Sequence, residues 1–477
     1  MKTRIKPKGN ILLLLLLINC LYVFSQNENY TLEKCIQIGT KNNLNIKKNQ
    51  LTNQINEKTL EQSKANRIPT INAIANQQIN WGRSIDPSSN QFINNQITSN
   101  NFGVSGSLVL FSGFQNQHTI EQNKLNYQAG EYDIEKSKND ITLNIIGYYM
   151  QIVLFTKQIE AAKLQYVNTQ NQIDRTEKLL TQSMVTEDAV YKLKAQLSTD
   201  LQNINSINNQ LKQAKLNLCQ QMQIPFESNI VIDTTQIIKP IDIDTSDYLQ
   251  TAKNAEKNMP QIKSMELRVQ SSRYSLNASR GGYYPRLTLN GGIATIYSSQ
   301  YKEIKEVTGI NSFVTGYVNN DLSLPVYGYI PTYSQQVIPF QKQINNNLYQ
   351  YVSLNLSVPL LNAKTTRIAV EKSKINIDLS NINKSIAINQ LYVDIQIAYN
   401  NYVAAYDKYL TTNTTLDARR SSYKIANARF ESSFISIYNF LEEKSGLSKA
   451  ELDFLQAKYE LIFRRKILDF YKGELNY

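Results

Sequence analysis

Residues 102–113 read FGVSGSLVLFSG, and residues 352–363, which lie 250 positions later, read VSLNLSVPLLNA. In both stretches apolar residues alternate with mostly polar ones, and this period of two predicts a β-strand with one apolar face. Each stretch is followed by a long run without proline, which extends to Gln182 in the first case and to Glu431 in the second. The sequence therefore predicts two strands, each leading into a long helix.

The two stretches belong to an internal duplication. Residues 41–69 match residues 257–285 at an offset of 216, and residues 107–211 match residues 357–461 at an offset of 250. The 34 additional residues of the second copy fall in a segment rich in Tyr, Gly, Asn and Pro, which predicts a long loop over residues 297–347. We expect a first repeat over residues 26–235 and a second over residues 236–477.

Within each repeat the hydrophobic period predicts the order helix, strand, strand, long helix, helix. The last helix of each repeat has apolar residues at intervals of seven: Val190, Leu197, Ile204, Leu211 and Leu218, and Phe440, Leu447, Phe454, Leu461 and Leu468. The long helices show steps of three and four: Ile141, Ile145, Tyr148, Ile152, Phe155, Ile159, Ala162 and Tyr166, and Leu391, Ile395, Ala398, Tyr402, Ala405 and Tyr409. Such spacing is typical of coiled coils.

Two further alternating segments precede these strands, one starting at Ile71 and one at Leu287, and each strand is about ten residues long. That length suits a tilted strand that crosses a bilayer. Pro69, Pro285 and Pro359 stand where helix and strand should meet. Four strands cannot close a barrel in lipid, so we expect an oligomer: two copies supply eight strands around a filled interior, and three supply twelve around a lumen. A soluble sandwich would need a second sheet, which the pattern does not offer.

The N-terminus predicts a signal peptide over residues 1–25, because four cations precede a short apolar run from Ile11 to Ile18. The alternative is a lipoprotein anchored through Cys20, although Asn19 stands where a small residue is expected. Beyond this segment no stretch approaches the roughly 20 apolar residues of a transmembrane helix. Any membrane span should therefore consist of strands.

Several functional classes are disfavoured by composition. The net charge of +12 arises from scattered cations, which does not indicate a nucleic-acid surface. Cys35, Cys219 and the single histidine, His118, lack the spacing of a metal site or a disulfide framework. Dispersed carboxylates such as Asp86 and Asp133 have no catalytic partners, and no phosphate-binding loop is present. We expect no enzyme activity and no cofactor.

The duplicated strand-to-helix junctions, Leu110-Phe111-Ser112-Gly113 and Pro359-Leu360-Leu361-Asn362, together with the seven-residue seams, resemble the TolC family of outer-membrane efflux proteins. The resemblance covers about residues 29–472. It implies a homotrimer whose twelve-stranded barrel in the outer-membrane lipid continues into a periplasmic barrel of helices. It also implies an exit duct of a tripartite efflux or type I secretion system, served by a periplasmic adaptor (membrane fusion protein) and an inner-membrane pump of the RND, ABC or MFS type.

In that family the turns that follow the long helices form the periplasmic tip, where the adaptor docks. In this sequence the corresponding residues are Ser183, Met184, Val185 and Thr186 in the first turn and Ser433, Phe434, Ile435 and Ser436 in the second. The family often has Gly where this chain has Ser183 and Ser433. Glu187 and Asp188 should lie favourably at the start of the next helix, near the positive end of its dipole.

The family also carries acidic residues one helical turn apart that surround the closed entrance. The corresponding positions here are Asn439 and Glu442, of which only one is acidic. A ring of carboxylates contributed by several copies would favour cations. The alternative for Glu442 is an ordinary solvated residue like Glu443. The alternative for the whole chain is a structural coiled-coil tether of the envelope without a conducting pore.

Overall fold

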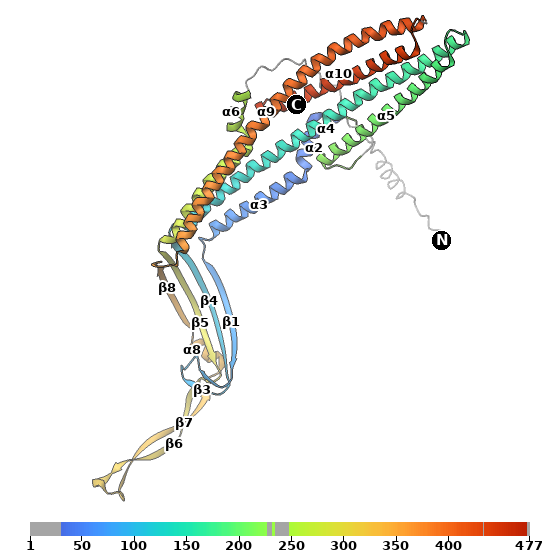
Figure 1. Cartoon of the computed structure of the whole chain (residues 1–477). Coiled ribbons are helices and arrows are strands. Elements are labelled where there is room, and N and C mark those ends of the chain that lie inside the picture. Colours follow the sequence, from blue (N-terminus) through green and yellow to red (C-terminus); the bar gives the residue numbers. More distant parts are fainter. Residues whose placement is uncertain (1–29, 227–230, 234–247, 433, 475–477) are drawn as a thin grey trace, which may run out of the picture. The chain divides into compact units, whose positions relative to one another are not determined.

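The structure, a computed structural model, describes residues 30–226, 231–233, 248–432 and 434–474 (Figure 1). The expected signal peptide, its cleavage site and Cys20 lie outside these residues. The chain forms two compact units. One comprises Met1–Asn56, Asn126–Val269 and Leu379–Tyr477, and the other comprises Glu57–Leu125 and Gln270–Asp378.

The first half of the chain begins with two helices, continues through strands and ends in two longer helices. Its elements are α2 (Leu32–Asn42), α3 (Leu44–Ala65), β1 (Thr70–Asn80), β2 (Arg83–Ile85), β3 (Phe92–Asn94), β4 (Ile97–Ser112), α4 (Gln115–Thr181) and α5 (Glu187–Met222). The short strands β2 and β3 form a small hairpin between β1 and β4 that the sequence pattern did not predict.

The second half follows the same order with one large addition. Its elements are α6 (Tyr248–Asn258), α7 (Pro260–Arg280), the 3-10 turn η2 (Gly281–Tyr283), β5 (Arg286–Ser298), β6 (Lys302–Tyr317), η3 (Val318–Asn320), β7 (Pro325–Val337), α8 (Phe340–Asn346), β8 (Tyr349–Ser357), α9 (Thr365–Glu431) and α10 (Ile437–Lys472). The long helices α4 and α9 begin and end 250 positions apart, as do α5 and α10.

The first helix expected in each half is interrupted at corresponding positions. Asn43 separates α2 from α3, and Met259, 216 positions later, separates α6 from α7. Asn43 has an extended backbone, and its side-chain oxygen accepts a hydrogen bond from the backbone N–H of Asn45. At the second break, Pro260 opens α7, as proline favours the first position of a helix.

The long helices pair through the predicted seams. Helices α4 and α9 each contain 67 residues, which corresponds to about 100 Å at 1.5 Å per residue. Seam residues on α4 and α5 are buried together in one cluster: Ile159, Ala162, Ile204 and Ile207. On α9 and α10 the corresponding cluster contains Tyr402, Ala405, Leu461 and Leu468. These side chains confirm the predicted coiled-coil faces.

Strands β1, β4, β5 and β8 form one antiparallel sheet in the order β1-β4-β5-β8 (Figure 1). Pro69 and Pro285 precede β1 and β5, and Pro359 follows β8, as expected. Among the described strands, β1 pairs only with β4 and β8 pairs only with β5. The sheet of one chain therefore ends in two unpaired edges.

The expectation of a long loop over residues 297–347 is wrong. This segment contains the antiparallel hairpin of β6 and β7, followed by α8. The Gly and Tyr content that suggested a loop fits a strand pair equally well, because register shifts occur beside Gly309 and Gly316, and Tyr327, Tyr329 and Tyr333 lie within β7. Glycine therefore marked bulges in strands here and not the end of regular structure.

Both strand-to-helix junctions turn in the same way. Gly113 and Phe114 have left-handed backbones, with φ of 61° and 62°, and Ala363 and Lys364 repeat this with φ of 49° and 65°. At Gly113 a side chain would also collide with the chain, since an added Cβ would lie 2.3 Å from the carbonyl oxygen of Gly281. The first junction therefore requires glycine on two independent grounds.

Candidate functional site

The register of the sheet places its apolar side chains on one face. Leu289 of β5 is paired with Leu108 of β4 and Leu354 of β8, and directly paired residues of antiparallel strands share a face. The same face carries Ile71, Ala73, Ala75, Phe102, Val104, Leu287, Ile293, Val352 and Leu356. In the single chain Val352 is 81% and Leu354 62% exposed, whereas Phe102, Leu287 and Leu289 are half-buried.

The opposite face of the sheet is mainly polar. Asn290 of β5 lies between Ser107 of β4 and Ser353 of β8, and Asn72 of β1 is paired with Ser105. A sheet with one exposed apolar face and one polar face suits a boundary between lipid and water.

Aromatic side chains mark both ends of this sheet. Tyr283 and Tyr284 directly precede β5 at the end that the helices enter, and both are exposed. Trp81, directly after β1, is exposed at the other end. Aromatic residues at both ends of an apolar band are typical of strands that cross a membrane.

The turn between α4 and α5 contains the first predicted tip. Ser183 has a left-handed backbone with φ of 60°, a conformation that glycine adopts more readily than serine. Met184 and Thr186 are exposed, whereas Val185 packs against a buried cluster. Glu187 and Asp188 lie in the first turn of α5, as predicted, where negative charge is favoured.

The turn between α9 and α10 contains the second predicted tip, of which Ser433 lies outside the described residues. Phe434 is 82% exposed, and Ile435 packs against the same cluster as Val185. The hydroxyl of Ser436 accepts a hydrogen bond from the backbone N–H of Asn439 at 3.3 Å and so caps α10.

The two turns belong to one packed assembly of four helices. The shared cluster contains Ile173 of α4, Ala189 and Leu193 of α5, Phe430 of α9, and Ile437 and Phe440 of α10. The rings of Phe430 and Phe440 stack with centroids 4.7 Å apart. Arg175 of α4 forms an ion pair with Glu431 of α9 at 2.8 Å, and the ammonium of Lys192 lies 3.3 Å from the centre of the Tyr438 ring. Apolar, ionic and cation–π contacts thus join the tips.

Asn439 and Glu442 are both exposed on α10, one helical turn apart. Phe440 is fully buried in the cluster, whereas Glu443 is half-buried and forms an ion pair with Arg419 at 3.5 Å. The structure therefore gives Glu442 a different environment from its neighbour. The role of Asn439 and Glu442 in a constriction stays a prediction.

The sequence interpretation missed a buried polar network about two to four helical turns from the tips. Lys444 of α10 is 3% exposed, and its Nζ donates a hydrogen bond to Oγ1 of Thr169 at 2.8 Å. Thr169 donates to Oδ2 of Asp200 at 2.5 Å, and Gln196 donates to Oδ1 of the same carboxylate at 2.9 Å. Burial lowers the pKa of Lys444 to about 8, although Asp200 opposes this effect.

A signal for this network exists in the seam pattern. Asp200 follows Leu193 by seven residues and precedes Ile207 by seven, and all three are buried on α5. Lys444 likewise follows the buried Ile437 by seven residues on α10. A charge at a position that the seam buries indicates a partner on a facing helix.

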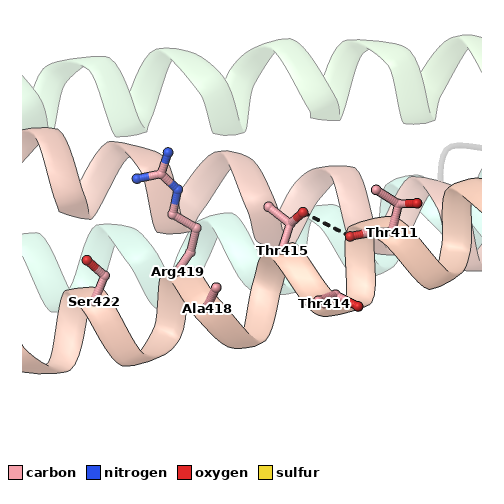
Figure 2. A pocket seen from close by; sticks show the side chains of 6 residues that line it. All are labelled: Thr411, Thr414, Thr415, Ala418, Arg419 and Ser422. Carbon is pink, nitrogen blue, oxygen red and sulfur yellow. Dashed lines mark hydrogen bonds between the residues drawn. The ribbon is translucent and has the colours of Figure 1, made fainter.

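A shallow groove lies along the exposed surface of α9. Figure 2 shows the side chains that line it: Thr411, Thr414, Thr415, Ala418, Arg419 and Ser422. The hydroxyl of Thr415 bonds back to the carbonyl oxygen of Thr411 at 2.9 Å. Most of these side chains are small, so another helix could approach this surface closely.

The other residues that could carry out chemistry, two cysteines and one histidine, pack against neighbouring side chains. Cys35 and Cys219 form no disulfide and are buried among apolar residues of α2, α4 and α5, and burial raises the pKa of Cys35 to about 12. His118 lies beside the ring of Tyr274. Within the described ranges, His, Cys, Asp and Glu side chains form no group that could hold a metal ion. Of the helices that can be described, none combines the length and apolar character needed to cross a bilayer.

Paired helices of this length, joined to a sheet with one apolar face, are the architecture of an outer-membrane export channel. A family model for "Outer membrane efflux protein" matches residues 36–222 and 251–473. The chain therefore belongs to the outer membrane efflux protein family, which confirms the resemblance to TolC-like proteins, the location in the outer membrane and the role in efflux.

Individual relatives are distant in sequence. The toxin and drug export protein A of Aggregatibacter actinomycetemcomitans is 19% identical over 370 residues, which cover 77% of this chain and 71% of that protein. The outer membrane channel CmeC of Campylobacter jejuni is 16% identical, with a TM-score of 0.71 over 94% of this chain and 86% of that one. The outer membrane channel MtrE of Neisseria gonorrhoeae is 14% identical, with a TM-score of 0.67 over 93% and 89%. These two solved structures share the fold.

Proposed function

We propose that three copies of this chain form a channel in which twelve strands enclose a pore through the outer membrane and the paired helices continue the pore into the periplasm. The observation that carries this proposal is the four-stranded sheet, which has one exposed apolar face and two unpaired edges. Unpaired strand edges are not tolerated in lipid, so β1 of one copy must pair with β8 of another.

The number of copies follows from the number of strands. Two copies would supply eight strands, whose interior is filled by side chains, whereas three would supply twelve and leave room for a lumen. The polar sheet face, with Asn290, Ser107 and Ser353 at its centre, would then line the water-filled interior.

The helices offer a matching surface for association. On α9, Ile368, Ile375 and Ile382 recur every seven residues and are exposed, as is Ile386. On α3, Leu44 and Leu51 are likewise seven residues apart and exposed. An apolar stripe of this spacing, uncovered in the single chain, is suited to packing against a helix of a neighbouring copy.

In this proposal substrates enter at the tips, pass along the helical tube and leave through the sheet ring. The tip residues Met184 and Phe434 present apolar side chains to a periplasmic adaptor. An inner-membrane pump of the RND, ABC or MFS type supplies the energy. Glu442 and Asn439, repeated in three copies, line the entrance, and the carboxylates make it selective for cations.

The experiment is to purify the full chain in detergent, measure its mass by light scattering, and record single-channel currents in planar bilayers. A trimer that conducts ions is the expected result. A monomer contradicts the ring, and a trimer without conductance identifies the envelope tether instead.

The entrance is tested in the same bilayers by ion selectivity. We expect Glu442→Gln to reduce the preference for cations and Asn439→Asp to increase it. Glu443→Gln is the matched control, because Glu443 is already paired with Arg419. Equal selectivity in all three variants would remove Asn439 and Glu442 from the entrance.

A further inference from the structure

The short helix α8 packs on the apolar face of the sheet, at the C-terminal end of β5 (Figure 1). The centre of the Phe340 ring lies 5.0 Å from that of Tyr297 and 6.2 Å from that of Phe102. The hydroxyl of Thr295 donates a hydrogen bond to the carbonyl oxygen of Ile344 at 2.7 Å. Thr295 is paired with Phe102, and Tyr297 follows two residues later on β5, so all three sheet residues lie on the apolar face. Helix α8 therefore covers one end of that face.

Hydrogen bonds to the backbone hold α8 in this position. The fully buried side chain of Gln343 accepts a hydrogen bond from the backbone N–H of Ser298 at 2.9 Å and donates to the carbonyl oxygens of Ser298 and Ile338. The side-chain amide of Asn347, directly after α8, donates to the carbonyl oxygen of Ile296 at 2.7 Å. The helix is thus a defined part of the sheet surface.

The outer surface of α8 is polar. Its exposed residues are Gln341, Lys342, Asn345 and Asn346. Lys342 forms an ion pair with Glu303 of β6 at 2.5 Å. Amide groups and an ion pair are costly to place against acyl chains, where water cannot solvate them. The apolar surface that the sheet offers to lipid is therefore replaced, where α8 begins, by a surface that suits lipid headgroups.

The length of the uncovered apolar face agrees with the thickness of a membrane. From Leu287 to Thr295 strand β5 rises about 27 Å, at about 3.4 Å per residue. A tilt of about 40° converts this length into a height of about 21 Å, close to the apolar band of about 25 Å in outer-membrane barrels. The exposed Tyr283 and Tyr284 precede β5 at the opposite end of this band. Helix α8 therefore lies at the level where the acyl layer should end.

We propose that α8 lies in the headgroup layer of the outer leaflet of the outer membrane and that its polar surface contacts lipid headgroups. This inference rests on the proposed ring, because it requires lipid on the apolar face of the sheet. It adds a fixed depth, since a shift of the sheet toward the periplasm would move the ion pair of Lys342 and Glu303 into the acyl layer.

The test measures the depth of a fluorescent label in vesicles that contain the full-length protein. Asn345→Cys carries a bimane label on the outer surface of α8, and Gln341→Cys, one helical turn earlier, is a second position on the same surface. The native Cys35 and Cys219 are buried and stay in place. The vesicles contain lipids with a doxyl quencher either near the headgroup or near the end of the acyl chain.

We expect the shallow quencher to reduce the fluorescence of both α8 labels at least twofold more than the deep quencher does. Stronger quenching by the deep lipid would place α8 inside the acyl layer and overturn the proposal. Quenching by dissolved iodide but by neither lipid would place α8 in water, either within the pore or above the membrane, and would also overturn it.

Two neighbouring regions of β8 supply matched controls. Val352→Cys is paired with Gly291 in the middle of the apolar face, and its label should be quenched more by the deep lipid. Asn355→Cys is paired with Thr288 on the polar face, and its label should respond only to iodide.

The controls also separate this inference from the proposed function. If the Val352 label is quenched by lipid and the α8 labels are not, only the position of α8 is wrong. If the Val352 label escapes both lipids as well, the apolar face of the sheet does not contact lipid, and the proposed ring is wrong.

Discussion

The buried network of Lys444, Thr169 and Asp200 allows the sharpest quantitative prediction. Asp200→Asn preserves the size of the side chain and its contact with Thr169 but removes the negative charge. The ammonium of Lys444 then remains buried at neutral pH without a carboxylate nearby. We expect the region around the network in α4, α5 and α10 to open more often.

The magnitude follows from the burial of Lys444. Its pKa of about 8, against 10.5 for an ordinary lysine, corresponds to about 3 kcal/mol for holding the charge inside the protein. Breaking a buried pair usually costs about 3–5 kcal/mol. Lys444 loses its proton once its pKa falls below the pH, so with a folded-state pKa of about 8 the loss of Asp200 should cost at most about 1.4 kcal/mol at pH 7, which is roughly a tenfold increase in the open population.

The effect of Asp200→Asn on local stability should depend on pH in a predictable direction. Because the pKa of Lys444 is lower in the folded protein, the unfolded state binds more protons between about pH 8 and pH 10.5, and stability contributed by this group rises with pH in that window. Without Asp200 the pKa falls further and the window begins at lower pH. The difference between the natural chain and Asp200→Asn should therefore shrink from pH 7 to pH 9.

Hydrogen exchange measured by mass spectrometry is the suitable assay, because it reports local opening and does not require reversible unfolding of the whole assembly. Exchange rates are corrected for the intrinsic effect of pH. Lys444→Met combined with Asp200→Asn should regain most of the lost protection, since no unpaired charge remains. Asp188→Asn is the control, because the pair of Asp188 with Lys192 lies at the surface. Unchanged protection in Asp200→Asn, or a double variant no better than the single one, would refute the reasoning.

Three other predictions follow from the geometry. Leu354→Lys on the apolar face of the sheet should cost about 2–4 kcal/mol and reduce insertion into membranes, whereas Ser353→Lys on the polar face should insert normally; equal membrane fractions on a flotation gradient would contradict the assignment of faces. Ser183→Gly should stabilise the first tip by about 1 kcal/mol, because glycine adopts a left-handed backbone without strain. Gly113→Ala should destabilise the strand-to-helix junction by more than about 1 kcal/mol. Hydrogen exchange of the adjoining helix ends measures both effects, and a stabilising Gly113→Ala would be inconsistent with the collision at Gly281. Cys35, whose pKa burial raises to about 12, should resist maleimide at pH 8 until the protein is denatured, and rapid labelling of the native protein would show that its surroundings are open.

The sequence predicted the fold where periodicity was strong. Seam residues such as Tyr402 and Leu461 are buried as expected, and the alternation around Leu354 gave the correct strand and the correct face. The proline positions also located the changes from helix to strand, because a missing N–H group acts locally and does not depend on the remainder of the chain.

The interpretation failed where composition replaced periodicity. In β6 the bulges beside Gly309 and Gly316 shift the register, so the alternation of this strand is broken and resembles a loop. The alternation becomes visible only when the paired residues of the two strands are compared, and the pairing cannot be read from the one-dimensional sequence.

The network around Lys444 was missed for a different reason. A lysine and an aspartate at seam positions 244 residues apart have no visible relation in one dimension, although each is unusual in its own helix. The assignment of the two turns as tips rests on resemblance and stays a prediction, and Ser183 of the first turn adopts a backbone conformation that glycine prefers.

The free edges of β1 and β8 also matter before any ring exists. When the edge of one molecule joins the opposite edge of a second, the contact is head-to-tail, and contacts of this kind either close upon themselves or extend without limit. If the proposed ring is correct, unassembled chains can therefore associate either into a finite ring or into an open ribbon. We expect overproduction to favour the ribbon, because chains then meet faster than rings can close.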